Sequence, residues 1–282
     1  MRAPDVTVVV VSWRTRDLTL ACLDSIARDA SRADVSCEVV VVDNASGDGT
    51  VEAVSREHPE ALVVENAENL GFAAACNRGV ARASGRYVLL LNPDAEIAPG
   101  TLGRLAGHLD ANPDVAVAGC RLVAPDGSAQ FSCGRFLTPW NQFAETLKLG
   151  PPRRSYAAAE VAGDAADVDW VVGACLAVRR SAFDEIGGLD ERFFMYSEDE
   201  DLCFRLRTKG WRVHYLPGVE VRHVGGGSVA HAIERMRSET RASQAAFVRK
   251  HRGRSAELAF RALMRLADLK PLRRRRQTGW ER

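Results

Sequence analysis

The chain has 282 residues, of which 46% are hydrophobic and 27% charged, and its formal net charge is +1. This is the composition of a globular protein with one large domain or two small ones, and it excludes a disordered chain, a collagen or a coiled coil as the main architecture. No apolar run approaches the roughly 20 residues of a membrane-spanning helix, and the N-terminus lacks the apolar core of a signal peptide. We therefore expect a cytoplasmic protein.

Apolar, β-branched runs alternate with amphipathic stretches over the first 120 residues. Such runs are typical of strands buried on both faces of a sheet, and the stretches between them have helical periodicity. Strands are expected at Val6–Ser12, Glu38–Val42, Ala61–Glu65, Arg86–Leu91 and Val115–Ala118, and helices at Asp17–Arg28, Thr50–His58, Phe72–Ala83 and Pro99–Ala111. The alternation predicts an α/β fold with a parallel sheet and helices on both of its faces.

The second half of the chain is less regular. We interpret Pro125–Asp167, with its paired prolines and alanine-rich stretches, as an insertion with weak structure. Strands are expected at Asp169–Arg180, Trp211–Leu216 and Val219–His223, a helix from Ser197 to Gly210, and helical structure from the glycine triplet at 225–227 to about Leu269. Ser197 and Glu200 have the spacing of a capping box, in which two side chains bond backbone N–H groups at a helix start.

The charge is distributed unevenly along the chain. Residues 252–282 carry ten Lys and Arg against three Asp and Glu, whereas the rest of the chain carries 28 against 34. A basic tail predicts a polyanionic partner. Within it, Ser255–Leu269 has an apolar stripe and Arg273–Arg276 follows, which is typical of an amphipathic helix lying on anionic lipid or of a helix packed on the protein beside solvated charges. The stripe consists of Ala259, Ala262, Leu263, Leu266 and Leu269.

Polar side chains follow several strands of the predicted sheet. Asp43, Asn69, Asn92 and Asp94 all come after expected strands, whose carboxyl ends are where open α/β sheets bind ligands. Turn formation and helix capping explain one such loop, but several at one edge favour a nucleotide site. There is no GxxxxGK[ST] motif, which excludes a P-loop NTPase. The GxG at Gly47–Gly49 lacks the third glycine, which disfavours a dinucleotide oxidoreductase. A diphosphate would then need a divalent cation held by Asp94.

Two further features are candidates for chemistry. The acidic cluster Glu198–Asp201 stands at a helix start, where the helix dipole stabilises carboxylates, and one of them can instead face a cleft and accept a proton. His223 ends a strand just before the glycine triplet and is either structural or functional. The seven cysteines are scattered without a CxxC pair, so we expect small buried side chains rather than a zinc site or disulfides.

Seven segments together resemble the family 2 glycosyltransferases of GT-A fold, especially their bacterial rhamnosyltransferase-like branch. They are VVVVSW (8–13), VVDNASGDGT (41–50), ENLGFAAACNRG (68–79), LLLNPDAEI (89–97), DWVVGACLAVRR (169–180), IGGLDERFFMYSEDEDLCFRLRTKGW (186–211) and VEVRHVGGGS (219–228). The resemblance spans about residues 5–250. It implies a nucleotide-diphospho-sugar transferase fold with a Rossmann-like, mostly parallel sheet, and an inverting sugar transfer that depends on Mn²⁺ or Mg²⁺.

The resemblance also assigns roles to residues. It implies that Asp199 is the general base and that Asp94 and His223 are metal ligands. Donor-nucleotide contacts fall on Ser12, Asp43, Asn69, Arg78 and Asn92, and contacts on the acceptor or sugar side fall on Trp170, Gly173 and Glu198. Asn92 replaces the first aspartate of the family's DXD motif, so the donor diphosphate must supply metal ligands. Residues 1–120 then form the nucleotide-sugar-binding half, 121–228 the acceptor-binding and catalytic half, and 229–282 the C-terminal helices with the basic tail.

The rhamnosyltransferase-like branch favours L-rhamnose from dTDP-L-rhamnose as the transferred sugar. The acceptor would be a hydroxyl on a glycan, a lipid-linked saccharide or a metabolite, with peripheral membrane contact through the basic tail and no nucleic-acid partner. Two alternatives stay open. A nucleotidyltransferase-like enzyme would carry a phosphate loop rich in glycine and lysine, whereas Ser12-Trp13-Arg14-Thr15 has neither. A non-catalytic nucleotide-sugar-binding module would bind the donor without turnover.

Overall fold

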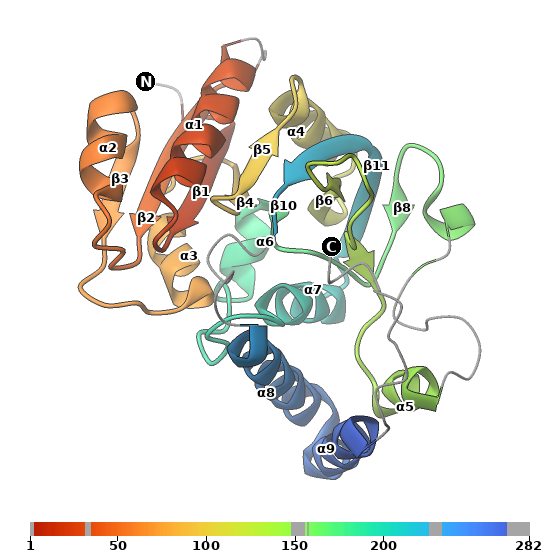
Figure 1. Cartoon of the computed structure of the whole chain (residues 1–282). Helices are drawn as coiled ribbons and strands as arrows, with labels where there is room; N and C mark the ends of the chain where they lie inside the picture. The colour runs from red at the N-terminus through yellow and green to blue at the C-terminus, as the bar shows by residue number, and fades with distance from the viewer. Residues whose placement is uncertain (1–2, 32–34, 148–155, 157, 226–232, 270–282) are drawn as a thin grey trace.

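A mixed α/β sheet forms the centre of the molecule (Figure 1). The computed structural model describes residues 3–31, 35–147, 156, 158–225 and 233–269. The sheet has the order β3-β2-β1-β4-β10-β6-β11-β5, with β8 paired to β11. Its strands are β1 (Val6–Ser12), β2 (Cys37–Asp43), β3 (Leu62–Glu65), β4 (Tyr87–Leu91), β5 (Ala95–Ile97), β6 (Val115–Val123), β8 (Ala166–Asp167), β10 (Cys175–Arg179) and β11 (Arg212–His223). A separate pair joins β7 (Cys133–Gly134) to β9 (Trp170–Val171).

Strand directions bring the ends of most strands to one edge. Strands β1 to β4 are mutually parallel, and β6 is parallel to β11. Strand β10 lies between β4 and β6 and is antiparallel to both, so β4, β6 and β11 also run in the same direction. The carboxyl ends of β1, β2, β3, β4, β6 and β11 therefore meet at the same edge, the location expected for ligands.

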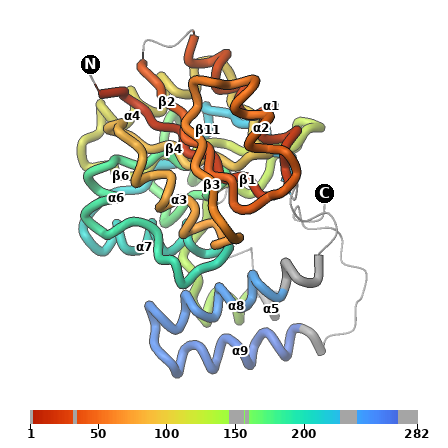
Figure 2. Tube along the Cα trace, turned by 90° about the vertical axis from the view of Figure 1, so that its left-hand side faces the viewer, coloured from red at the N-terminus to blue at the C-terminus, as the bar shows by residue number. Residues whose placement is uncertain are grey.

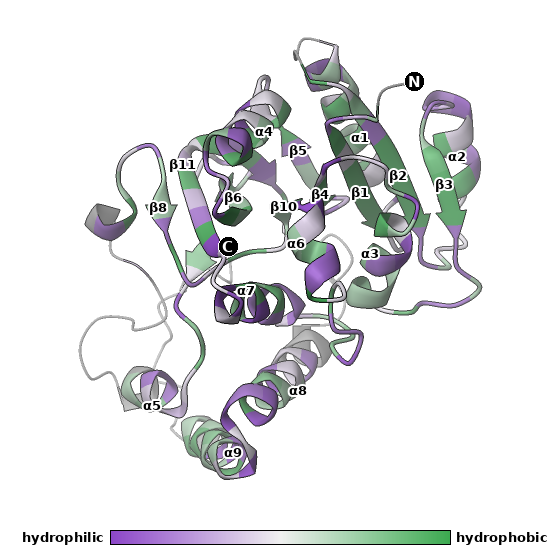
Figure 3. Ribbon diagram, turned by 180° about the vertical axis from the view of Figure 1, so that it is seen from behind, coloured by the Kyte–Doolittle hydropathy of each residue, from purple (hydrophilic) through white to green (hydrophobic). Residues whose placement is uncertain are grey.

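Helices cover both faces of this sheet. In β1, Val8 and Val10 enter one apolar cluster and Val9 and Val11 the other, which explains why the run is apolar throughout. The first cluster receives α1 (Arg16–Ala30), α2 (Thr50–Glu57) and α4 (Thr101–Ala111), and the second receives α3 (Phe72–Val80), α6 (Arg180–Glu185) and α7 (Glu198–Thr208). The hydropathy colouring of Figure 3 shows the predominantly apolar strands.

Three more helices form a lobe beyond α7. They are α5 (Pro139–Leu147), α8 (Ile233–Arg252) and α9 (Arg254–Leu269). Phe247 and Phe260 are fully buried in a third apolar cluster that also contains Leu137 and Phe193. Figures 1 and 2 both show α7, α8 and α9 as successive layers away from the sheet. No helix in the described part of the chain is both long enough and apolar enough to cross a membrane.

Several local expectations are wrong in detail. The two strands predicted between Trp211 and His223 are one strand, β11, whose register shifts between Leu216 and Glu220 around Pro217 and Gly218. The strand predicted over Asp169–Arg180 is divided into β9 and β10. The insertion predicted to have weak structure contains β7, α5, a 3₁₀ turn at Ala158–Val161 and β8. Six of the seven cysteines are buried, as expected, and Cys37 is half-buried.

Candidate active site

The ends of β1 and β2 form the first part of the site. Ser12 and Asp43 are register partners at these ends. Asp43 is 5% exposed, and its Oδ2 accepts a hydrogen bond from the Ser46 N–H at 3.0 Å. Its Oδ1 is buried and has no hydrogen-bond partner. An unsatisfied buried acceptor costs about 1–3 kcal/mol, so the geometry suits a ligand that brings an N–H.

The Ser12 hydroxyl faces inward rather than toward this acceptor. It lies 3.1 Å from the Thr15 hydroxyl and accepts a hydrogen bond from Thr19 at 3.0 Å. The Ser12 carbonyl accepts from the Asn44 N–H at 2.8 Å. Ser12 thus fixes the β1 and β2 loops together.

An asparagine network extends the site from β2 toward α3. Asn44 donates to Asn69 Oδ1 at 2.9 Å, and Asn66 donates to Asn44 Oδ1 at 3.0 Å. Arg78, exposed on α3, donates to Asn66 Oδ1 at 2.7 Å. The sequence reasoning singled out Asn69 and Arg78 but not Asn66, which joins them. The sequence feature that could have identified Asn66 is its position directly after the expected strand Ala61–Glu65.

A glycine connects this network to the segment before α7. Gly71 has φ of +83°, and a Cβ there would lie 2.4 Å from the Phe194 carbonyl oxygen. The Phe72 N–H donates to that same oxygen at 2.7 Å. Only a glycine allows this approach, which holds the loop preceding the acidic cluster against the donor-side loop.

Asp94 and His223 lie together at the end of β4 and β11. His223 pairs with Ala95 in the β11–β5 register, which brings His223 next to the preceding residue, Asp94. His223 Nε2 is 3.3 Å from Asp94 Oδ1, and Asp94 Oδ2 accepts from the Gly225 N–H at 3.1 Å. The described residues contain no group of three or more His, Cys, Asp or Glu side chains placed to hold a metal ion. A cation here would therefore need further ligands from a bound molecule or water.

Gln130 sets the orientation of the His223 ring, and sequence reasoning missed it. Its Nε2 donates to the His223 carbonyl at 2.9 Å, so its Oε1 must face His223 Nδ1, which lies 2.8 Å away. Because an amide oxygen only accepts, Nδ1 carries a proton, and Nε2 is the ring nitrogen that faces Asp94. Asn92 Nδ2, 3.4 Å from Nε2, lies on the same side. A second partner that fixes the tautomer is characteristic of metal-binding histidines.

Asp199 lies on the first turn of α7, half-buried. Its Oδ2 accepts from the Gly173 N–H at 2.9 Å, and its Oδ1 accepts from the Glu200 N–H at 2.8 Å. The next residue after Gly173, Ala174, accepts from the Asn92 N–H at 3.0 Å. A short backbone path therefore connects Asp199 to the loop that carries Asn92 and Asp94.

The other acidic residues of the cluster differ sharply from Asp199. Glu198 is 6% exposed, and its Oε2 is buried without a hydrogen-bond partner. Burial, with the Asp199 carboxylate nearby, raises the pKa of Glu198 well above its usual value, which favours its neutral form. Asp201 is fully buried and bonds Arg205, Lys250 and His251 at 2.5–2.7 Å, so it faces α8 rather than the cleft.

The capping box predicted at this helix start is wrong. Ser197 has φ of 66° and makes no side-chain cap hydrogen bond. Glu200 is 2% exposed, and its Oε1 accepts from the Leu137 N–H at 2.5 Å. Asp199, not Ser197, bonds a first-turn N–H, so the carboxylates of this turn are used for tertiary contacts.

Trp170, predicted on the acceptor side, is 6% exposed. Its indole N–H donates to the Arg135 carbonyl at 3.2 Å, and its ring contacts Phe131. Trp170 thus supports the strand that leads to Gly173.

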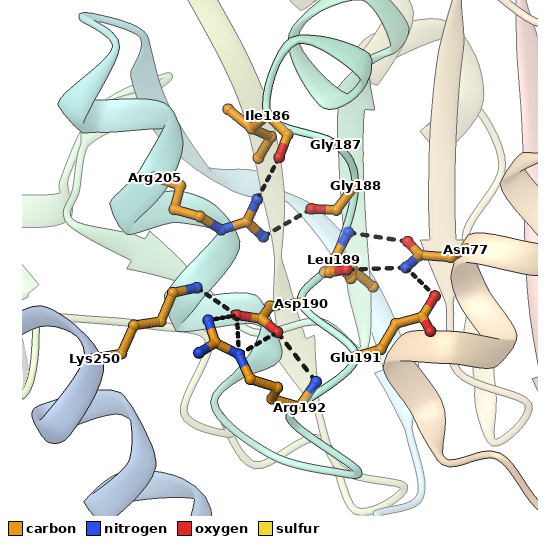
Figure 4. A pocket seen from close by; sticks show the side chains of 10 residues that line it. All are labelled: Asn77, Ile186, Gly187, Gly188, Leu189, Asp190, Glu191, Arg192, Arg205 and Lys250. Atoms are coloured by element: carbon orange, nitrogen blue, oxygen red, sulfur yellow. Dashed lines mark hydrogen bonds and ion pairs between the residues drawn. The ribbon is translucent and has the colours of Figure 1, made fainter.

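A separate cavity of about 470 Å³ is lined by the loop at 186–192 and by residues of α3, α7 and α8 (Figure 4). The cations that line it are already engaged. Arg205 donates to the Ile186 and Gly188 carbonyls, and Lys250 pairs with Asp190. This arrangement anchors the loop before α7, and none of the predicted site residues lines the cavity.

The Glycosyltransferase like family 2 profile matches residues 4–253 of the chain. The chain belongs to this family. Membership of a glycosyltransferase family argues against the alternative of a nucleotidyltransferase-like enzyme. An N-acetylglucosaminyl-diphospho-decaprenol L-rhamnosyltransferase of Mycobacterium tuberculosis is 34% identical over 202 residues, which are 66% of this chain and 66% of that protein. The rhamnosyltransferase WbbL of Escherichia coli K12 is 29% identical over 49% of this chain and 52% of its own.

Solved structures agree on the fold. A mannosyltransferase from Pyrobaculum calidifontis, in complex with GDP-Man and Mn²⁺, superposes with a TM-score of 0.62 at 24% identity, over 95% of this chain and 70% of its own. The glycosyltransferase therefore has the predicted GT-A fold.

Proposed function

We propose that the protein transfers L-rhamnose, with inversion, from dTDP-L-rhamnose to a saccharide hydroxyl. The observation that carries this proposal is the short backbone path that joins the Asp94–His223 pair to Asp199 through Asn92, Ala174 and Gly173. It combines a place for a diphosphate's cation with a carboxylate able to accept a proton. The rhamnosyltransferase names of the two relatives support the choice of sugar.

Asp43 is proposed to recognise the nucleotide base. Its unpartnered Oδ1 would accept the N3–H of thymine or uracil, which would satisfy the buried oxygen. Ser12, Asn69 and Arg78 would hold the loops around the nucleotide, and Asn92 would face the ribose. These contacts lie in residues 1–120, the proposed donor half.

The residues at the strand ends fit a divalent cation such as Mn²⁺ or Mg²⁺. Asp94 offers a carboxylate oxygen and His223 an Nε2 lone pair that Gln130 directs toward it. When bound, the cation would neutralise the departing nucleoside diphosphate, whose oxygens complete its ligand set.

Asp199 is proposed to remove the proton from the acceptor hydroxyl. Its two backbone N–H bonds orient the carboxylate. The hydroxyl oxygen then attacks the anomeric carbon from the face opposite the leaving diphosphate. The raised pKa of Glu198 favours its neutral form, which makes Asp199 the better candidate for the base. Gly173 positions this carboxylate, and Glu198 and Trp170 would shape the acceptor side within residues 121–228.

The acceptor is proposed to be a lipid-linked saccharide. The name of the mycobacterial relative specifies such an acceptor for that protein. Residues 229–282, the proposed helical region with a basic tail, would then lie near lipid.

Donor turnover tests this proposal. The protein is incubated with dTDP-L-rhamnose, UDP-glucose or GDP-mannose, with Mn²⁺ or with EDTA, and with a lipid-diphosphate-linked N-acetylglucosamine acceptor. We expect dTDP release and a rhamnosylated product that depend on Mn²⁺ and on Asp199. Donor binding without turnover of any sugar would instead indicate the non-catalytic binding module.

A further inference from the structure

Helix α9 presents two different faces to its surroundings. Ala256, Phe260 and Met264 are spaced one helical turn apart and pack into the third apolar cluster. On the opposite face, Leu258 is 60% exposed and Leu266 55% exposed. Ala262, also exposed, lies between these two leucines at i, i+4 and i+8 spacing, so the outer side of the helix carries a continuous apolar stripe.

Exposed apolar side chains concentrate in this lobe. Among the residues that the structure describes, the three most exposed large apolar side chains are Trp140, Leu258 and Leu266, at 55–60%. Trp140 belongs to α5, which packs against α9. Figure 3 shows α9 as largely apolar although it is the outermost helix in Figures 1 and 2. Clustering of this kind marks an interaction surface, whereas single exposed leucines do not.

Arginines border the stripe. Arg254, Arg261 and Arg265 are exposed on α9 and fall on one flank of the leucines. Glu257, in contrast, is buried and pairs with Arg249 and Arg261. From residue 254 to residue 276 the sequence has eight basic and two acidic residues. The outer side of α9 is therefore both apolar and basic.

We propose that this surface, made of Leu258, Ala262 and Leu266 with Arg254 and Arg265, docks on an anionic lipid bilayer. The leucines would enter the boundary between headgroups and acyl chains while the guanidinium groups stay among the phosphates. A nucleic acid would engage the arginines but leave the leucines in water. A symmetric second copy of the chain packed antiparallel on this helix would oppose arginines with arginines.

This surface differs from the one expected from the sequence. The predicted stripe included Leu263, which faces partly inward, and omitted Leu258, which is among the most exposed side chains of the helix. The basic run Arg273–Arg276 lies outside the described residues. The expected lipid contact through the amphipathic helix at 255–269 is therefore kept, but the apolar residues that make it are Leu258, Ala262 and Leu266.

The position of the α9 surface fits a membrane-bound acceptor. Only α8 separates α9 from α7, whose first turn carries Asp199. Lipid docking does not rest on the proposed function, because binding is measured without donor or acceptor. The lipid-docking proposal can therefore fail while the proposed sugar transfer holds, and the reverse.

Co-sedimentation of the full-length chain with vesicles tests the proposal. One set of vesicles mixes phosphatidylglycerol with phosphatidylcholine, and the other contains phosphatidylcholine alone. We expect binding to the anionic set only, weakened by salt. The variants Leu258→Ser/Leu266→Ser and Arg254→Glu/Arg265→Glu should each bind at least about tenfold more weakly. Leu62→Ser/Arg56→Glu, made at the far β3–α2 side, is the matched control and should bind like wild type.

Four outcomes would overturn the proposal. They are failure of the wild type to sediment, equal binding to both vesicle sets, unchanged binding by the leucine variant, and a wild-type dimer in gel filtration that the leucine variant abolishes. A full-length variant with Arg273–Arg276 changed to Gln separates the sources of binding. If this variant loses vesicle binding while the two α9 variants keep it, the tail and not the α9 surface is responsible. Equal melting temperatures of all variants ensure that folding is not what changed.

Discussion

Glu198 and Asp199 are adjacent carboxyl groups to which the fold gives different environments. Glu198 is buried with an unpartnered oxygen and a raised pKa, whereas Asp199 accepts two backbone hydrogen bonds. We expect Asp199→Asn to keep donor affinity and lose transfer by at least about a hundredfold, because the amide cannot accept the proton. Glu198→Gln resembles the neutral acid and should retain most of the activity. Transfer rates and donor affinities of both variants decide the assignment, and the opposite pattern would identify Glu198 as the base.

The His223 ring offers a second prediction at the residue scale. Asp94→Ala should abolish metal-dependent turnover, and His223→Ala should weaken it less, because water can fill a coordination position. Gln130→Leu removes the acceptor that fixes the ring, so the Mn²⁺ concentration for half-maximal rate should rise about 10–100-fold with the maximal rate largely restored at high Mn²⁺. A Mn²⁺ titration of the rate measures this. An unchanged midpoint in Gln130→Leu would show that ring orientation does not control metal affinity.

At the scale of elements, a buried ion network fastens the catalytic helix to the C-terminal lobe. Asp201 on α7 is fully buried and bonds Lys250 and His251 on α8. Burial tends to raise the pKa of Asp201, but the bonds to His251, Lys250 and Arg205 outweigh it and lower the pKa below 3.8. A depressed folded-state pKa means that this stabilisation is present above the unfolded value, near pH 4, and is lost as pH falls through the folded value.

We therefore expect Asp201→Asn to destabilise the protein by about 1.5–3 kcal/mol, because a fully buried carboxylate loses its charged hydrogen bonds to Arg205 and Lys250. Its stability deficit relative to wild type should begin to shrink as pH falls below about 4 and should be smallest below the lowered folded-state pKa, where the wild-type carboxylate is also protonated. Urea unfolding at neutral and acidic pH measures both. Asp184→Asn, which disrupts the more exposed pair with Arg180, is the matched control and should change stability by less than about 1 kcal/mol. A deficit independent of pH would contradict the role of the charge.

Periodicity predicted most of the elements, because apolar runs such as Val6–Ser12 report burial directly. It failed where tertiary contacts override local pattern. The Ser197–Glu200 spacing is that of a capping box, yet Glu200 bonds Leu137, 63 residues away. Likewise, Gln130 bonds His223, 93 residues away, and no local pattern marks such a pairing. The family motifs allowed residues such as Asp94 and His223 to be predicted from the sequence. They did not allow prediction of Gln130, which orients the His223 ring.

On the scale of the whole molecule, the unsatisfied oxygen of Asp43 couples stability to ligand binding. The free protein keeps a buried carboxylate oxygen without a donor, which opposes folding, and a nucleotide that supplies the N–H relieves this cost. Asp43→Asn retains an oxygen for the Ser46 N–H but replaces the charged oxygen with an amide group. The melting temperature of the free variant should therefore equal or exceed that of wild type.

The liganded state should respond in the opposite direction. At 100 times its dissociation constant, a ligand stabilises a protein by about 2.7 kcal/mol, so dTDP with Mn²⁺ should raise the wild-type melting temperature by several degrees. Asp43→Asn loses a hydrogen bond to a charged acceptor, worth about 1.5–3 kcal/mol, and should require at least tenfold more dTDP for the same rise. Asp48→Asn, changed in the neighbouring turn where the carboxylate bonds Thr50, is the control and should retain the dTDP response. Asp43→Asn could instead lower the melting temperature of the free protein and leave the dTDP response intact. Asp43 would then be a structural carboxylate, and the thymine of the nucleotide would bind elsewhere on this edge of the sheet.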